Sequence, residues 1–344
     1  MSGCNVMEYK YDAHDASLMT PFLYRFFISP MLKIVPYQIP ANIITIISNS
    51  CVLVSFIIAG FGYYRNNFDF YFLIPILCFL YLIGDCFDGV QARRTKTCSP
   101  LGEYFDHFLD SFVTGLLTGT LLFALRSTNP IVIIFPFQAL YLGQIGTFWE
   151  RLKKGVMSFG LISTSEGVMA IAIPSFLVSI PFVQRLVVLN KFIFSLSIMD
   201  FTLLIAFFFA GVAGIKAIIT SKKFSLKLIL HVLLSCFVTS CCVVFGLSIL
   251  LTTLLTTLYN AFFISPLLSA ISEKKEEKFP DFILPLLFVL CFFMKDWCSF
   301  IPTIQLIYIA FRIMVRFSVF FYANRHFWVW KNKECIPINL LGNH

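Results

Sequence analysis

Long uncharged runs dominate the chain and determine its fold class. A membrane-spanning helix needs about 20 mostly apolar residues, and stretches of this kind recur along the whole sequence. They lie at about 42–63, 68–87, 107–125, 131–149, 167–183, 198–219, 228–246, 248–271, 282–299 and 300–323. The run from Leu228 to Ser272 has no Asp, Glu, Lys or Arg and is too long for one span, so we expect a turn near Gly246. The pattern predicts an all-α protein with about ten transmembrane helices.

Composition agrees with a polytopic membrane protein. Of the 344 residues, 58% are hydrophobic and only 13% are charged, whereas a soluble domain carries about 25% charged residues. So little charge cannot cover a water-soluble globule of this size. Soluble enzymes and nucleic-acid-binding domains are therefore excluded, despite the net charge of +8.

Basic residues predict the orientation of the spans, because Lys and Arg collect in cytoplasmic loops. With the N-terminus inside, 19 of the 26 basic residues fall in cytoplasmic segments and 5 fall outside. The other two, Arg312 and Arg316, lie in the last span and either contact a lipid phosphate or snorkel to the interface. We therefore expect both termini in the cytoplasm. Residues 17–35 are apolar with interspersed Arg25 and Lys33, which suits an amphipathic helix in the membrane interface.

Four aspartates interrupt the apolar pattern near the cytoplasmic end of the second and third spans. Asp85 and Asp88 stand three residues apart, and Asp106 and Asp110 stand four apart. Both spacings put the pair on one helix face. Four neighbouring carboxylates repel one another unless a cation neutralises them, and a set of oxygen ligands suits Mg²⁺, Mn²⁺ or Ca²⁺. The alternative is a solvated loop in which acidic residues balance basic ones.

The residues between the aspartates suit a phosphate-containing substrate. Mg²⁺ usually completes its shell with substrate phosphates, and Arg93 offers donors to phosphate oxygens. Gly89, Ala92 and Gly102 are small and would let a substrate approach the backbone. The sequence therefore predicts a metal-dependent phosphate site that faces the cytoplasm.

These residues resemble the CDP-alcohol phosphotransferase family at every fixed position of its motif. The match runs Asp85-x-x-Asp88-Gly89-x-x-Ala92-Arg93, eight residues, then Gly102-x-x-x-Asp106-x-x-x-Asp110. Residues 9 to about 168 are similar to the choline/ethanolamine phosphotransferases of that family, including a first-helix Pro-Asn-x-x-Thr motif with one extra residue at Pro40 to Thr45.

The resemblance implies an enzyme that moves phosphocholine or phosphoethanolamine from CDP-choline or CDP-ethanolamine to a lipid hydroxyl, with diacylglycerol as the expected acceptor and CMP released. It implies that a pair of Mg²⁺ or Mn²⁺ ions binds to the four aspartates. Asn42, Gly89, Ala92, Arg93 and Gly102 would then hold the CDP-alcohol. His107 and Glu166 would form a His–Glu pair that activates the acceptor hydroxyl, with Asp110 as the alternative base.

The family resemblance also sets the expected organisation. Residues 1–37 would form a cytoplasmic and interfacial segment, 38–220 a catalytic core of about six transmembrane helices, and 221–344 further transmembrane helices with a short cytoplasmic tail. The protein would reside in the endoplasmic reticulum or Golgi of a eukaryote, or in a bacterial inner membrane, with membrane lipids and a second copy of the chain as candidate partners. Rival interpretations are a different head group or acceptor such as ceramide, a UbiA-like prenyltransferase, and an ion-coupled transporter.

Overall fold

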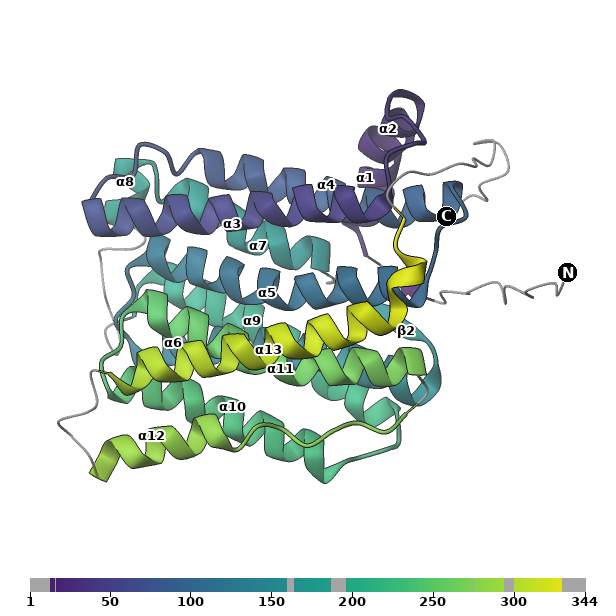
Figure 1. Ribbon diagram of the computed structural model, residues 1–344. Helices are drawn as coiled ribbons and strands as arrows, with labels where there is room; N and C mark the ends of the chain where they lie inside the picture. Colours follow the sequence, from purple (N-terminus) through teal and green to yellow (C-terminus); the bar gives the residue numbers. More distant parts are fainter. Residues whose placement is uncertain are drawn as a thin grey trace, which may run out of the picture.

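Long helices that run side by side form the body of the protein (Figure 1). This computed structural model describes residues 13–15, 17–159, 164–186, 196–273, 275–293 and 300–329. Within them, 8 helices are long and apolar enough to cross a membrane. They are α3 (Ala41–Arg65), α4 (Leu73–Arg94), α5 (Pro100–Leu125), α6 (Pro130–Lys154), α9 (Ile198–Thr220), α10 (Leu226–Val244), α11 (Ile249–Glu273) and α13 (Ile301–Asn324). The all-α membrane fold is confirmed.

Two of the ten predicted spans contain, among the described residues, a helix of only 11 to 14 residues. Helix α7 (Thr164–Leu177) has 14 residues and α12 (Ile283–Phe293) has 11, whereas a straight span needs about 20. Residues 275–282 have no regular structure and lead into α12, which therefore fills only part of the bundle length (Figure 1). The four-residue helix α8 (Pro181–Gln184) follows α7. The expected turn is confirmed, because Gly246 has a positive φ of 64° between α10 and α11.

Capping residues fix where α5 and α9 begin. The Ser99 side chain accepts a hydrogen bond of 3.1 Å from the Gly102 backbone N–H, and Pro100 takes the first helical position of α5. Such a cap satisfies one of the free N–H groups of a first turn. At α9, Ser197 and Asp200 form a reciprocal capping box. The Asp200 carboxylate therefore caps the start of α9.

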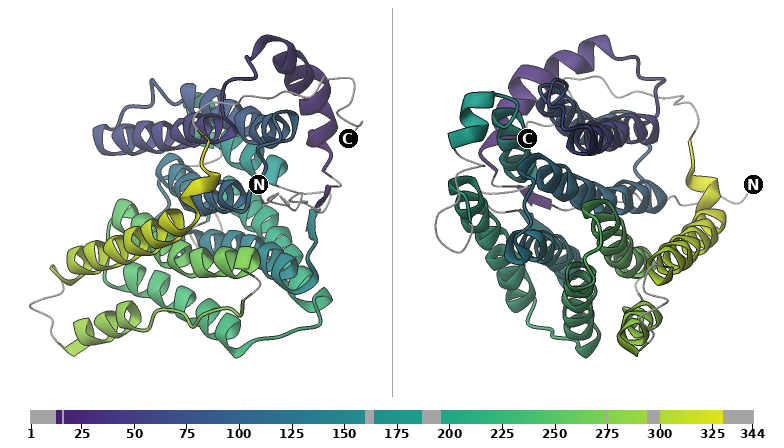
Figure 2. Two further views of the ribbon diagram at one scale, coloured as in Figure 1. Left: turned by 45° about the vertical axis from the view of Figure 1, so that its right-hand side comes forward. Right: turned by 90° about the vertical axis from the view of Figure 1, so that its left-hand side faces the viewer.

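Helices α6 and α9 pack backbone to backbone. A Cβ atom at Gly146 would lie 2.6 Å from the Gly214 carbonyl oxygen, and one at Gly214 would lie 2.3 Å from the Leu142 carbonyl oxygen. Only glycine permits this approach, which is typical of helix pairs in membranes. The end-on view in Figure 2 shows the helices arranged as a closed cluster in cross-section.

The N-terminal segment lies crosswise at one end of the bundle (Figures 1 and 2). It consists of α1 (Met19–Leu23), a π-helical turn (Tyr24–Ile28) and α2 (Ser29–Ile34). One face is buried against α4, and Phe22, Phe26 and Ile34 are exposed on the other. The predicted helix is confirmed, and its place in the membrane interface stays a prediction. Just before it, β1 (Ala13–Asp15) pairs in parallel with β2 (Met157–Phe159), a small exception to the all-helical pattern.

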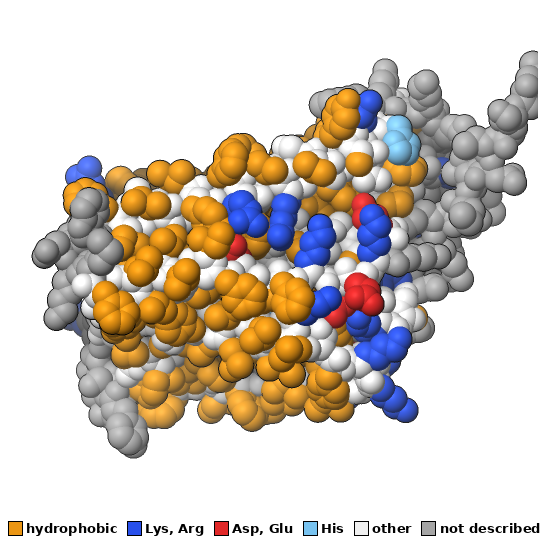
Figure 3. Space-filling view, turned by 60° about the horizontal axis from the view of Figure 1, so that its bottom comes forward, with side chains coloured by type: hydrophobic (Ala, Val, Ile, Leu, Met, Phe, Trp, Pro, Cys, Tyr) orange, Lys and Arg blue, Asp and Glu red, His pale blue; other side chains and the backbone are white. Residues whose placement is uncertain are grey.

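The arginines of α13 contact protein groups in the C-terminal half. Pro266 lacks an N–H, so the Phe262 carbonyl of α11 has no donor four residues on, and Arg316 Nη1 donates to it at 2.8 Å. Arg312 lies 3.7 Å from Asp281, which also accepts from the Tyr308 hydroxyl at 2.8 Å. Figure 3 shows basic side chains set within a largely hydrophobic face. These contacts reduce the cost of the charges without requiring a lipid phosphate.

Candidate active site

A cavity of about 1140 Å³ opens between the helices of the N-terminal half. Helices α3, α4, α5, α6, α7 and α9 contribute to its wall, together with α1. Every residue that the sequence proposed for the site lines this one cavity: Asn42, Asp85, Asp88, Gly89, Ala92, Arg93, Gly102, Asp106, His107, Asp110 and Glu166. The structure thus brings all of these residues to one cavity, and the role of each residue stays a prediction.

Three of the four aspartates converge closely enough to share a cation. One carboxylate oxygen from each of Asp85, Asp106 and Asp110 lies within 4.8 Å of the others. Oδ1 of Asp106 is buried and has no hydrogen-bond partner among the described residues. A buried carboxylate oxygen without a donor is costly, and a hard divalent cation is the ligand that such oxygens suit. The residues therefore fit a metal ion.

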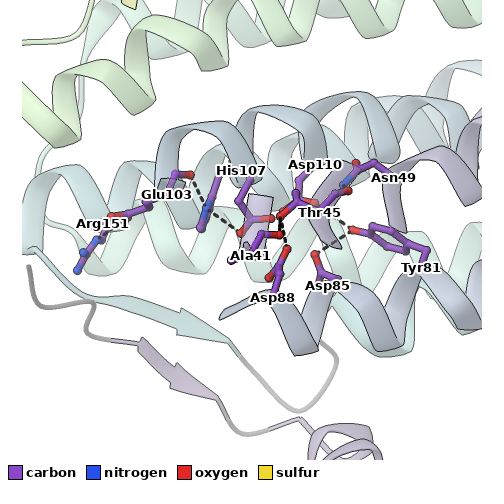
Figure 4. A network of polar contacts seen from close by, with 11 residues as sticks. Ala41, Thr45, Asn49, Tyr81, Asp85, Asp88, Glu103, His107, Asp110 and Arg151 are labelled. Carbon is purple, nitrogen blue, oxygen red and sulfur yellow. Dashed lines mark hydrogen bonds and ion pairs between the residues drawn. The ribbon is translucent and has the colours of Figure 1, made fainter. Parts of the chain in front are cut away.

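The fourth aspartate, Asp88, is held by a neighbouring helix. The Thr45 hydroxyl of α3 donates to Oδ2 of Asp88 at 2.5 Å (Figure 4). This contact depends on close packing of α3 and α4, since a Cβ atom at Gly84 would lie only 2.5 Å from Cβ of Ser48. Gly84 thus lets the acidic turn of α4 approach α3. Thr45 was seen in the sequence only as part of the Pro-Asn-x-x-Thr match.

Tyr81 is a second supporting residue that the sequence did not assign to the site. Its side chain is fully buried, and its hydroxyl donates to Asp110 at 3.0 Å and lies 3.5 Å from Asp85 (Figure 4). One hydroxyl therefore orients carboxylates from two helices. Tyr81 lies four residues before Asp85, which places both on one face of a helix. This spacing alone does not single Tyr81 out, because aromatic residues make up 17% of the chain.

His107 lies beside the aspartates on the same face of α5. Its Nδ1 atom is 3.0 Å from the Glu103 carbonyl oxygen and 3.6 Å from Oδ2 of Asp106. When Nδ1 carries the proton and donates to that carbonyl, Nε2 is the unprotonated nitrogen that can accept a proton. The ring also packs against Phe148, with the centroids 5.3 Å apart. This arrangement is compatible with a general base.

Glu166, at the start of α7, binds the N-terminal segment. Its Oε1 atom accepts from the Ser17 hydroxyl at 2.7 Å and from the Met19 backbone N–H at 2.9 Å. The carboxylate thereby caps α1 and anchors it over the cavity. The His–Glu pair stays a prediction, and nothing in the sequence had indicated that Glu166 contacts the N-terminal segment.

Most of the residues proposed for the nucleotide lie on the α3–α4 side of the cavity, with Asn42 on α3 and Gly89, Ala92 and Arg93 on α4, whereas Gly102 lies on α5. A Cβ atom at Gly102 would lie 3.8 Å from Oδ1 of Asn42, so the glycine leaves space beside that amide. Nη2 of Arg93 lies 3.5 Å from the Tyr24 hydroxyl of the N-terminal segment. Arg93 and Tyr24 both line the cavity, which places a guanidinium where a phosphate could reach it.

The opposite wall comes from α6. Nε of Arg151 lies 3.5 Å from Oε1 of Glu103, and both side chains are more than nine-tenths buried. Of the aromatic residues on these helices, Tyr81 and Phe148 line the cavity. Tyr104 instead stacks on Phe320 at 4.0 Å, and Trp149 donates to the Lys223 carbonyl oxygen at 2.8 Å.

Comparison with known proteins finds a family match in the N-terminal half of the chain, which contains the acidic cluster. The profile of the CDP-alcohol phosphatidyltransferase family matches residues 38–198. These residues form a CDP-alcohol phosphatidyltransferase domain. The domain contains the acidic cluster and most of the cavity lining.

Characterised and uncharacterised relatives share this domain. Cholinephosphotransferase 1 of Mus musculus is 31% identical over 172 residues, which cover 48% of this chain and 43% of that protein. An uncharacterized CDP-alcohol phosphatidyltransferase class-I family protein of Schizosaccharomyces pombe is 30% identical over 174 residues, covering 48% and 45%. Choline/ethanolaminephosphotransferase 2 of Arabidopsis thaliana is 36% identical over 118 residues, covering 32% and 30%. The matched part thus spans less than half of each relative.

Proposed function

We propose that the protein transfers phosphocholine or phosphoethanolamine from a CDP-alcohol to the hydroxyl of a lipid, with diacylglycerol as the acceptor, and releases CMP. The observation that carries the proposal is that charged residues and apolar residues line the same cavity. The acidic cluster and Arg93 line it together with apolar residues of the membrane-spanning helices, among them Leu117, Leu140 and Ala210. A charged nucleotide and an apolar lipid can therefore reach the same space.

Asp85, Asp106 and Asp110, with Asp88 beside them, would hold Mg²⁺ or Mn²⁺, as a pair of ions by family resemblance. Bound metal would neutralise the diphosphate and stabilise the leaving CMP. Thr45 and Tyr81 orient the carboxylates through their hydroxyls, and such outer contacts commonly tune a metal site.

The other residues would bind the donor and activate the acceptor. Arg93 would contact phosphate oxygens, and Asn42, Gly89, Ala92 and Gly102 would shape the nucleotide side of the cavity. His107 would accept the proton of the lipid hydroxyl at Nε2, since Nδ1 faces the Glu103 carbonyl oxygen. Glu166 would support this step by its predicted pairing with His107 or by anchoring α1, and Asp110 is the alternative base.

The setting of the reaction follows from the bias of basic residues. We propose that the cavity end of the bundle faces the cytoplasm, where nucleotide-activated substrates are found. In a eukaryote the membrane would be that of the endoplasmic reticulum or Golgi, and in a bacterium the inner membrane. A homodimer is a further expectation.

A panel of substrates tests the proposal and determines which head group is transferred and which lipid accepts it. Purified protein in detergent micelles is offered CDP-choline or CDP-ethanolamine with diacylglycerol or ceramide, and labelled head group is followed into lipid. We expect transfer to diacylglycerol with at least one donor. Transfer only to ceramide would replace the acceptor, and no transfer with any pair, while a prenyl diphosphate is consumed, would favour the UbiA-like alternative.

A further inference from the structure

Glu103 is a buried carboxylate of the cavity wall that lies outside the aspartate cluster. Its side chain is 9% exposed, and Oε1 lies 3.5 Å from Nε of Arg151. The other oxygen, Oε2, is buried and has no hydrogen-bond partner among the described residues. Buried polar atoms are nearly always satisfied, so this oxygen suits a ligand that brings a donor or a positive charge.

The position of Glu103 on α5 relates it directly to the reacting groups. Glu103, Asp106 and His107 are spaced at i, i+3 and i+4, which places them on one face of the helix, with Cβ atoms about 5–6 Å apart. All three line the cavity. A phosphate held at the aspartates therefore lies within about one helical turn of the Glu103 carboxylate. The alcohol part of a CDP-alcohol, a two-carbon chain ending in nitrogen, has this reach.

An aromatic ring completes this part of the wall. Phe148 lines the cavity, and its ring packs against the His107 ring with centroids 5.3 Å apart. Because an aromatic face attracts organic cations, Phe148 and Glu103 present complementary features to an ammonium group. Asn42 and Arg93 lie on α3 and α4, whereas Glu103 and Phe148 lie on α5 and α6, so most of the residues proposed for the nucleotide come from other helices than those proposed for the ammonium.

We propose that Glu103, together with Phe148, binds the ammonium head group of the donor and determines which alcohol the enzyme transfers. The inference rests on the proposed function, because it assigns the head-group part of the CDP-alcohol to a named wall of the same cavity. Ethanolamine carries N–H donors that can reach Oε2, whereas choline carries methyl groups and would rely on charge and on the ring. Both head groups carry a positively charged nitrogen, which the Glu103 carboxylate would attract.

Equilibrium binding separates head-group recognition from nucleotide recognition. The full chain, purified in detergent with Mg²⁺ and without lipid acceptor, is titrated with CDP, CDP-ethanolamine and CDP-choline. We expect Glu103→Gln to raise the Kd of at least one CDP-alcohol by about tenfold or more, the usual scale for a lost contact to a charged group. The Kd of CDP, which has no head group, should stay within about threefold.

Two further variants keep the test decisive. Glu150→Gln is the matched control: Glu150 is another buried carboxylate of this cavity, and Lys154 pairs with it at 2.9 Å. It should leave all three Kd values within about threefold. Phe148→Leu should weaken CDP-choline more than CDP, and it tests the same wall if Glu103→Gln does not fold.

The outcomes distinguish this inference from the proposed function. An equal loss of affinity for CDP and both CDP-alcohols would show that Glu103 serves only to position Arg151. Unchanged Kd values in Glu103→Gln would overturn the inference and leave the proposed function intact. A wild-type protein that binds none of the three nucleotides would contradict the proposed function itself.

Discussion

The Thr45 hydroxyl donates a hydrogen bond of 2.5 Å to Oδ2 of Asp88 and so joins α3 to the acidic turn of α4. The carboxylate is buried, and its orientation depends on a residue more than forty positions earlier in the chain. The acidic site is therefore built from three helices, with Thr45 on α3, Asp85 and Asp88 on α4, and Asp106 and Asp110 on α5.

Removing the Thr45 hydroxyl should impair turnover while leaving the fold intact. We expect Thr45→Val to lower kcat about 10- to 100-fold, the range usual for outer-shell partners of a metal site. Raising the Mg²⁺ concentration should recover part of the loss. Ser55→Ala on the same helix is the control, because the Ser55 hydroxyl donates to the Cys51 carbonyl oxygen of its own helix and Ser55 is not among the residues that line the cavity. Equal activity of Thr45→Val and wild type would remove Thr45 from the site.

The contacts of Glu166 lead to a comparison of three variants. A general base usually contributes about 10²- to 10⁴-fold in rate, so His107→Ala should lower kcat strongly with little change in the Kd of CDP-alcohol. If Glu166 acts with His107, Glu166→Gln should resemble His107→Ala, and the double variant should be little worse than either single one.

Ser17→Ala tells the two roles of Glu166 apart. The Ser17 hydroxyl donates to Glu166 at 2.7 Å, so its loss should reproduce the Glu166→Gln defect if anchoring of α1 is what matters. A large defect in Glu166→Gln with normal kcat in Ser17→Ala supports the His–Glu pair. If His107→Ala keeps most of its kcat, the base is Asp110 or no side chain at all.

The orientation of the bundle is open to chemical labelling. Arg126 closes α5 at the end opposite to its Pro100 start, and Lys96 and Lys153 belong to the cavity end of α4 and α6. In active single-cysteine variants, we expect Lys96→Cys and Lys153→Cys to react with an impermeant maleimide from the cytoplasmic side. Arg126→Cys should react only from the other side, and the reverse pattern would invert the proposed topology.

The polar network of the C-terminal half should contribute to stability and not to donor binding. Asp281 accepts from the Tyr308 hydroxyl and from the Leu284 backbone N–H, both at 2.8 Å. We expect Asp281→Ala to cost about 2 kcal/mol in free energy of unfolding, since buried donors lose their acceptor. A thermal unfolding scan should show a lower Tm, with the Kd of CDP unchanged. Glu273→Ala, at an exposed pair with Lys275, is the control, and an equal Tm in both variants would contradict the assignment.

The sequence predicted most of the fold because the bilayer imposes a length on each span. Eight apolar runs became long helices, and the turn at Gly246 lies where two spans had to be divided. Composition alone could not show that α7 ends at Leu177, because residues 178–182 are also largely apolar. Helix α12 begins next to Asp281, whose carboxylate accepts from the Leu284 backbone N–H and from the hydroxyl of the α13 residue Tyr308, distant in sequence.

Spacing located the site, because carboxylates at i, i+3 and i+4 must share a helix face. The partners that orient them could not be found in the same way. Thr45 and Tyr81 line the cavity from other turns and helices, and Ser17 donates to the lining residue Glu166. Threonine, tyrosine and serine are common throughout the chain. The Glu103–Arg151 pair could not be predicted either, because the two residues lie on different helices, α5 and α6, and pair only in the folded structure.

The central claim is that the acidic cavity couples a CDP-alcohol to a lipid hydroxyl, and the rate of CMP release measures this directly. Purified protein is given a CDP-alcohol with or without diacylglycerol, and with Mg²⁺ or excess EDTA, beside an Asp106→Asn variant. We predict CMP and labelled phospholipid in equal amounts, only when both metal and lipid acceptor are present, and loss of both products in Asp106→Asn. Full turnover in excess EDTA, or wild-type turnover by Asp106→Asn, would contradict the account.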